Sequence, residues 1–189
     1  MNNKVGSMWK KWDLHIHTPF SVLNHGDLGD GFDRLKRESI VDDYVHELFT
    51  RAINEKIDVI GVTDYYLIEG YKAVKKVLED SSRLSKIFAA ELSRDVKYLQ
   101  YIKEITVFPN IEFRLELGIS EKTPNGLKNS KYQLHVIFSN DVDIQKIEDN
   151  FLHRLEYTTY VNDGKHDTYT ITKENFESYG TNLISKGIG

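Results

Sequence analysis

The chain has 189 residues, a formal net charge of −4 and no cysteine, and 40% of its residues are hydrophobic. This length suits one domain or most of a larger one, and the hydrophobic fraction argues against a disordered chain. The negative charge excludes nucleic-acid binding by bulk electrostatics, and the lack of cysteine excludes disulfides and thiolate metal sites. Residues 1–11 lack the apolar core of a signal peptide, and no apolar run approaches the roughly 18–20 residues of a membrane span. We therefore expect a cytoplasmic protein that does not enter a membrane, with residues 1–11 as an extension and 12–189 as the folded domain.

The sequence Trp-Asp-Leu-His-Ile-His at residues 12–17 alternates apolar and polar side chains, which predicts a β-strand. Side chains two residues apart on a strand point to the same face, so His15 and His17 should project side by side. Pro19 ends the strand because it has no N–H to donate and restricts the residue before it. The pair therefore lies at the carboxyl end of the strand, where α/β folds place their active sites. Two imidazoles on a rigid element suit a divalent metal ion, although the same pattern also occurs on a solvated strand face.

The next elements predict a parallel sheet. Residues 22–37 contain three glycines and three aspartates without any period, which predicts a loop. Apolar residues at a spacing of three to four predict a helix over 40–54, preceded by a capping box of Ser39 and Asp42. The apolar run at 57–62 predicts a strand buried on both faces. A strand, a loop, a helix and another strand in this order are typical of a parallel sheet.

The rest of the chain is predicted to continue with both helices and strands. The expected helices lie at 69–79, 84–104, 144–155 and 173–186. The expected strands lie at 105–117, 132–138, 157–161 and 168–171, with a polar loop at 118–131 and turns at 124–126 and 163–164.

Five polar side chains are expected at or near the carboxyl ends of the strands. They are His15, His17, Asp64, Glu112 and His135. Each has a structural explanation of its own: Asp64 can cap a turn, Glu112 can pair with a nearby arginine, and His135 can be a hydrogen-bonded core residue. Together they form a set of nitrogen and oxygen donors that a barrel would bring to one rim. Such a set suits zinc, manganese or iron better than calcium or magnesium.

Four of these stretches resemble motifs of the PHP (polymerase and histidinol phosphatase) superfamily. Residues 13–18 (DLHIHT), with Ser21 close behind, resemble the first motif, and residues 60–64 (IGVTD) resemble the second. Residues 110–113 (NIEF) are similar to the glutamate motif and residues 134–136 (LHV) to the next histidine motif. The opening stretch at 9–19 is more particularly similar to PHP domains at the amino terminus of large bacterial ATPases of the AAA or SMC type.

The resemblance implies a fold, a cofactor and a reaction. PHP domains are distorted (β/α)7 TIM-like barrels that hold up to three metal ions and hydrolyse phosphate esters. We therefore expect a barrel of this type, incomplete at its carboxyl end, with two or three ions of manganese, zinc or iron. By the resemblance, His15 and His17 would bind one ion, Glu112 would bridge two, and Asp64 and His135 would complete the ligands.

The same resemblance implies a substrate and a partner. The expected substrate is a phosphate ester, such as a nucleotide or a nucleic-acid end, and an attached or separate ATPase is the expected partner. Water activated by the metal ions needs no separate strong base, so no side chain is assigned a catalytic role. Arg114 shares the strand face of Glu112 and could contact the phosphate, or it could pair with Glu112 or Glu116 instead.

The sequence departs from the family pattern at three places. The second motif usually continues to a histidine, and here that residue is Tyr65. The aspartate that often follows the serine of the first motif is missing, with His25 and Asp27 as candidate substitutes in a longer loop. The closing Asp-x-His motif is also missing, so either the 189 residues are the front part of a longer polypeptide, which we expect, or the domain is a shortened variant.

These departures leave a second hypothesis open, in which a degenerate PHP-like module serves interaction with an ATPase or its regulation. Amidohydrolases also place two histidines at the end of a first barrel strand, but their metal-bridging lysine has no counterpart at a predicted strand end. The number of bound metal ions distinguishes the active phosphoesterase from the degenerate module, because an active site should bind two or three ions and a degenerate site one or none.

Overall fold

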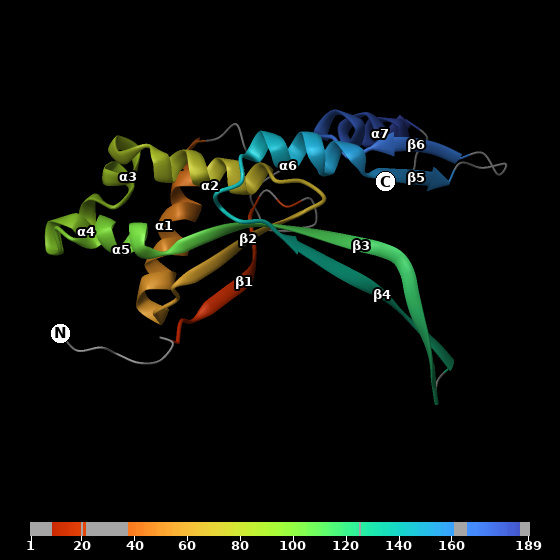
Figure 1. Ribbon diagram of the computed structural model, residues 1–189, viewed down its shortest axis with the longest axis horizontal. Helices are drawn as coiled ribbons and strands as arrows, with labels where there is room; N and C mark the ends of the chain where they lie inside the picture. The colour runs from red at the N-terminus through yellow and green to blue at the C-terminus, as the bar shows by residue number, and fades with distance from the viewer. Residues whose placement is uncertain (1–8, 20, 22–37, 125, 161–165, 186–189) are drawn as a thin grey trace. The chain divides into compact units, whose positions relative to one another are not determined.

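The computed structural model describes residues 9–19, 21, 38–124, 126–160 and 166–185, and Figure 1 shows their elements. They form a mixed α/β structure with a four-stranded sheet of order β1-β2-β3-β4 and a separate two-stranded sheet. A complete barrel is not present among these residues. The chain divides into two compact units. The first comprises Met1–Asp64, Ile68–Glu112 and His135–Asn140, and the second comprises Tyr65–Leu67, Phe113–Leu134 and Asp141–Gly189.

The first two strands confirm the predicted parallel pair. β1 (Trp12–His17) pairs with β2 (Val59–Tyr65), and His17 lies opposite Thr63. Every residue of β2 is buried, as expected of an apolar strand covered on both faces. β1 is the edge strand of the described sheet, and the Trp12 side chain is 56% exposed there. The pair therefore carries the two predicted histidines on an edge strand supported by a buried neighbour.

The register of this pair shifts between Asp13 and Ile16, so β1 carries one extra residue there. Gly61 of β2 faces this bulge. A Cβ atom added to Gly61 would lie 2.3 Å from the carbonyl oxygen of Leu14, which is closer than any real side chain approaches. The missing side chain therefore allows the two backbones to meet at Leu14. A bulge changes the direction of the side chains beside it, so this contact helps to set the direction in which His15 projects.

The helix after the first strand begins earlier than the sequence predicted. α1 (Glu38–Glu55) already contains Ser39 in its first turn, so the predicted capping box of Ser39 and Asp42 is wrong. Its buried face includes Val45 and Phe49, both 0% exposed, and the helix contacts α2, α3 and α5. α2 (Glu69–Glu79) has the predicted bounds.

The predicted helical region at 84–104 is divided into three short helices. They are α3 (Ser81–Ile87), α4 (Ala89–Arg94) and α5 (Tyr98–Glu104). The Asp80 side chain caps α3 by accepting hydrogen bonds from the backbone N–H groups of Ser82 and Arg83. None of the helices in the described part of the chain is both long and apolar enough to cross a lipid bilayer.

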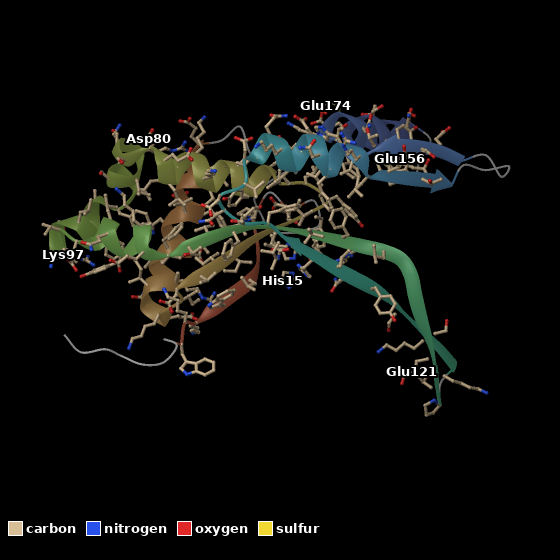
Figure 2. All side chains as sticks on the ribbon, viewed as in Figure 1. His15, Asp80, Lys97, Glu121, Glu156 and Glu174 are labelled. Carbon is tan, nitrogen blue, oxygen red and sulfur yellow. The ribbon has the colours of Figure 1, made fainter. Side chains whose placement is uncertain are left out.

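β3 (Thr106–Thr123) and β4 (Gly126–Ile137) replace the polar loop predicted at 118–131, and that prediction is wrong. The two strands are neighbours in the sheet and form a long hairpin, and Glu121 lies close to its tip (Figure 2). The turn predicted at 124–126 includes residue 125, which lies outside the described residues. Gly126 has a φ of 117°, a conformation that favours glycine, and its carbonyl accepts a hydrogen bond from the Thr123 hydroxyl. Consecutive residues 120–122 are all exposed, so both faces of this strand meet water. The alternation that identifies a strand is lost in such a segment.

At its base the hairpin joins the sheet. The backbone N–H of Thr106 donates to the carbonyl of Asp58 over 2.9 Å, and the N–H of Phe138 donates to the carbonyl of Pro109 over 3.0 Å. The residues just inside these two bonds, Asn110 to Glu112 on β3 and His135 on β4, belong to the first unit. The base of the hairpin therefore brings residues from the middle of the chain beside β1 and β2.

The second unit contains the remaining elements. They are α6 (Ile144–Asn150), a 3-10 turn (Leu152–Arg154), β5 (Glu156–Tyr160), β6 (His166–Thr170) and α7 (Lys173–Ser185). β5 and β6 are antiparallel, which confirms two predicted strands, and their turn at 163–164 lies outside the described residues. Tyr157 of β5 stacks on Phe176 of α7 at 5.0 Å and on Tyr169 of β6 at 5.5 Å, so aromatic contacts join the helix to the hairpin.

The Gly61 contact predicts the effect of a single added methyl group. Gly61→Ala should lower the free energy of unfolding by about 1–3 kcal/mol, because the new Cβ must push β1 away from β2. Urea denaturation followed by circular dichroism measures this change. The matched control is Gly180→Ala in α7, where an added Cβ meets nothing within 4 Å and should be neutral or stabilising. Equal stabilities for wild type and Gly61→Ala would contradict the close approach of the two strands.

Candidate metal centre

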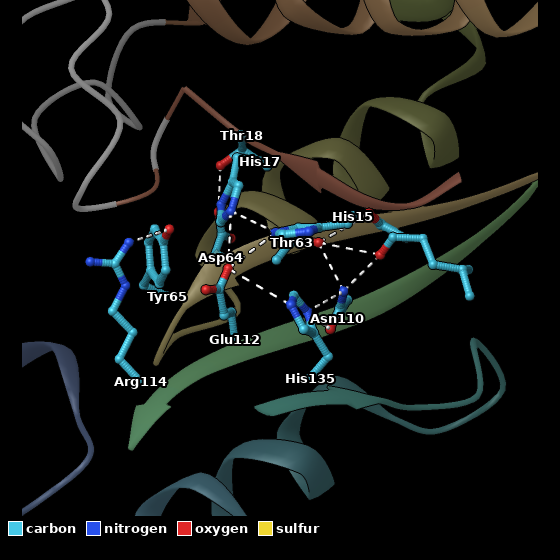
Figure 3. A network of polar contacts seen from close by, with 12 residues as sticks. His15, His17, Thr18, Thr63, Asp64, Tyr65, Asn110, Glu112, Arg114 and His135 are labelled. Carbon is cyan, nitrogen blue, oxygen red and sulfur yellow. Dashed lines mark hydrogen bonds and ion pairs between the residues drawn. The ribbon is translucent and has the colours of Figure 1, made fainter. Parts of the chain in front are cut away.

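Three side chains from two strands converge in the first unit (Figure 3). The Nε2 atoms of His15 and His17 are 2.9 Å apart, and each lies 3.1 Å from Oε2 of Glu112 on β3. A tetrahedral ion with metal–ligand distances of about 2.0–2.2 Å holds its ligand atoms about 3.4 Å apart. The three donors therefore need to separate by only a few tenths of an ångström to bind one ion. Three of the five predicted residues, His15, His17 and Glu112, are thus brought together and could hold a metal ion.

Glu112 is the most constrained member of this group. Its side chain is 0% exposed, and its Oε1 atom has no hydrogen-bond partner among the described residues. Its ion-pair partners in the described part of the chain are the histidines themselves. Burial lowers the pKa of His17 although Glu112 opposes the shift, so this imidazole favours its neutral, metal-binding form. The neutral His17 imidazole brings no positive charge to this buried carboxylate, and a divalent cation would fit both that charge and the donor atoms.

His135 of β4 lies next to the triad. Its Nε2 atom is 4.0 Å from Oε2 of Glu112, and its ring centre is 4.4 Å from that of His15. Burial also lowers the pKa of His135. Two ligands of one ion are at most about 4.2 Å apart, so His135 is within reach of an ion that Glu112 binds. On its other side the ring meets Asn110, a buried residue that the sequence patterns did not single out.

Asp64 is engaged elsewhere and is not a member of the three-residue donor group. Its carboxylate accepts hydrogen bonds from the Thr18 hydroxyl and from the backbone N–H of Gly70, the latter over 2.7 Å. Gly70 lies in the first turn of α2, so Asp64 caps that helix, the structural alternative that the sequence left open. A Cβ on Gly70 would lie 2.5 Å from Oδ2 of Asp64, so this contact also depends on glycine. The role of Asp64 as a metal ligand stays a prediction.

Arg114 and Tyr65 contact each other within the second unit. The Nη2 atom of Arg114 donates to the Tyr65 hydroxyl over 2.9 Å, and its guanidinium carbon lies 4.7 Å from the centre of the Tyr65 ring. This contact involves the tyrosine that departs from the family motif. The role of Arg114 as a phosphate contact stays a prediction, and the candidate substitutes His25 and Asp27 lie outside the described residues.

A cavity of about 370 Å³ borders the histidine pair in the first unit. Its wall on β1 includes His15 and His17, and its other wall is α1. The polar residues of that helix wall are Tyr44, Glu47 and Arg51. This volume lies in the range of small-molecule sites. The sequence analysis did not predict that this helix faces the histidine pair. The spacing of three and four residues between these side chains puts them on one helix face, and that spacing could have indicated it.

The hydrogen bonds and burial of Asp64 predict a pH dependence. Burial raises its pKa from 3.8 to about 6, so between these values the folded state binds a proton that the unfolded chain has released. The contribution of Asp64 to stability is therefore largest below pH 4 and falls as the pH rises to 6. The free energy of unfolding of wild type minus that of Asp64→Asn should fall by roughly 2 kcal/mol between pH 4 and pH 7. Urea denaturation at both pH values tests this, and a difference that does not change with pH would contradict it.

Comparison of the chain with protein-family models, with curated proteins and with solved structures found no match. The case for a function therefore depends on the residues of the site. Their strongest property is a buried carboxylate that faces imidazole nitrogens from β1 at 3.1 Å.

Proposed function

We propose that the chain is a metal-dependent phosphoesterase of the PHP type, with His15, His17 and Glu112 as the first ligands of a divalent ion. The observation that carries the proposal is the convergence of both Nε2 atoms on the fully buried Glu112 carboxylate. Two histidines and one glutamate with an open fourth position form a familiar catalytic zinc site. His135 would add a fourth donor, and Oε1 of Glu112 could reach a second ion, as expected of a bridging carboxylate.

In this proposal the sheet is the front part of a distorted (β/α)7 barrel. The parallel pair of β1 and β2, connected through α1, is the unit that such barrels repeat. The histidine pair lies at the carboxyl end of β1, which is the rim where barrels of this class assemble their active sites.

The chemistry follows from the donor set. A bound divalent ion supplies Lewis-acid chemistry, which activates water and offsets the charge that develops on phosphoryl oxygens. The chain would position that ion through the buried Glu112 carboxylate and the two β1 imidazoles, and burial favours the neutral form of the His17 imidazole. No separate side chain is needed as a strong base.

The cavity beside β1 is the proposed place for the organic part of the substrate. Ile16 and Leu48 provide apolar wall, while Asp13 and Glu47 can accept hydrogen bonds from hydroxyl or amino groups. Two carboxylates beside one arginine, Arg51, would repel a long polyanion. We therefore favour a small phosphate ester, such as a nucleotide, over a nucleic-acid end.

Two observations support a second candidate, a PHP-like module that regulates or binds an ATPase without hydrolysis. The Asp64 carboxylate is occupied by Thr18 and Gly70, and Tyr65 stands where the family motif has a histidine. Such a module would bind one ion or none.

The deciding experiment measures metal content and hydrolysis in the same preparations. Purified wild type and a His15→Ala/His17→Ala variant are incubated with manganese, zinc or iron, desalted, and analysed by plasma mass spectrometry. Wild type should retain two or more ions and hydrolyse p-nitrophenyl phosphate or a nucleotide, and the double variant should lose both properties. His153→Ala is the matched control, because His153 pairs with Asp149 outside the site and its removal should change neither result.

The possible outcomes separate the hypotheses. Absence of retained metal from wild type with all three ions would overturn the hydrolase proposal. One ion per chain without hydrolysis would favour the regulatory module. Equal metal retention by wild type and the double variant would show that the ions bind elsewhere.

A further inference from the structure

The side chain of Asn110 contacts one residue on each of the other three strands of the four-stranded sheet (Figure 3). Asn110 is on β3 and is 2% exposed. Its Nδ2 atom lies 2.7 Å from the Leu14 carbonyl oxygen on β1 and 2.9 Å from the Thr63 hydroxyl on β2. The ring of His135 on β4 is its third neighbour, with Nδ1 3.1 Å from Nδ2 and 3.3 Å from Oδ1.

The donor inventory of this amide fixes its orientation. The Leu14 carbonyl can only accept, so the nitrogen end of the amide must face it. An amide nitrogen has two hydrogens, and the Leu14 carbonyl and the Thr63 hydroxyl use both. No hydrogen of Nδ2 is then left for His135. The remaining bond runs from the Nδ1–H of His135 to Oδ1 of Asn110.

This bond determines which ring nitrogen of His135 can bind metal. A neutral imidazole that carries its proton on Nδ1 has a lone pair on Nε2. That Nε2 atom faces Glu112 at 4.0 Å, a distance too long for a hydrogen bond. Its lone pair is therefore left for a metal ion, in the manner of outer residues that orient metal-binding histidines.

We propose that Asn110 is the positioning residue of the metal centre. It holds His135 as the Nδ1–H tautomer with Nε2 directed at the ion, and the same amide holds the backbone of β1 immediately before His15. This proposal rests on the proposed function for what the bound ion does. The tautomer of His135 is a property of the metal-free protein and can be measured without the ion.

The first test is the tautomer of His135 in metal-free wild type. Long-range proton–nitrogen NMR at pH 8 distinguishes protonated from unprotonated ring nitrogens, and His135→Gln identifies the signals by their loss. We expect a protonated Nδ1 and an unprotonated Nε2. A proton on Nε2 would overturn the proposal, and this measurement needs no variant of Asn110 to fold.

The second test compares variants that remove different contacts of the amide. Asn110→Ala should remove the preference of His135 for the Nδ1–H tautomer. It should also weaken zinc binding, measured by calorimetry, by about 10–100-fold. Asn110→Asp retains an oxygen acceptor for His135 and should restore the Nδ1–H tautomer, which a merely structural role would not do. Thr63→Val removes the acceptor of one amide hydrogen and frees it for Nδ1 of His135, 3.1 Å away, so it should weaken the preference for the Nδ1–H tautomer. His153→Ala, at a residue that pairs with Asp149, is the matched control and should leave the tautomer unchanged.

The results separate this proposal from the proposed function. If the tautomer and the zinc affinities behave as expected but no phosphate ester is hydrolysed, the proposed function fails and the positioning role stands. If Asn110→Ala binds zinc as tightly as wild type, the positioning role fails, whatever the protein hydrolyses.

Discussion

The burial of the Glu112 carboxylate is the constraint on which the arrangement of the first unit depends. A carboxylate removed from water is costly unless hydrogen-bond donors or a cation compensate it. In the described residues its close polar neighbours are the His15 and His17 imidazoles of β1, whose Nε2 atoms lie 3.1 Å from Oε2. Small displacements of β1 relative to β3 would leave the carboxylate without them. The backbone must therefore hold these two strands in a narrow range of positions around one side chain.

β2 provides that support without contributing a ligand to the donor group. Gly61 admits the backbone of β1 at the bulge, and Thr63 accepts a hydrogen bond from Asn110. At its carboxyl end, Asp64 turns to Thr18 and to the first turn of α2. The three donors are thus carried by β1 and β3, with His135 of β4 beside them, while the strand between β1 and β3 sets their spacing. This separation of roles explains why a fully buried strand contains a glycine and a threonine among its large apolar residues.

The sequence predicted helices and strands correctly where the periodic spacing of apolar residues was strong. Alternation identified β1, the apolar run identified β2, and a spacing of three to four identified α2. The same alternation placed His15, His17 and Glu112 on converging faces. The distal hairpin was missed because residues 120–122 face water and carry no period. Composition and motifs supported a mixed α/β class, whereas a closed barrel is not present in the described residues.

The roles of Asp64 and Asn110 depend on contacts that no local pattern contains. The Asn110 amide bonds to a carbonyl 96 positions earlier, and whether Asp64 binds metal or caps a helix depends on Thr18, 46 positions earlier. A sequence pattern can propose which side chains are available. It cannot say which partner each one meets, because that is decided by the folded backbone.

The distance along the chain between the residues of the candidate metal centre also has a consequence for how the protein is made. His15 and Glu112 are 97 positions apart, and His135 follows later still. During synthesis β1 leaves the ribosome long before β3, so an ion bound by this group would have only its two histidine ligands until the base of the hairpin has emerged. Closing such a long loop is slow and entropically costly. An ion that binds only the assembled cluster would therefore secure the fold after it has formed, stabilising the finished first unit by mass action.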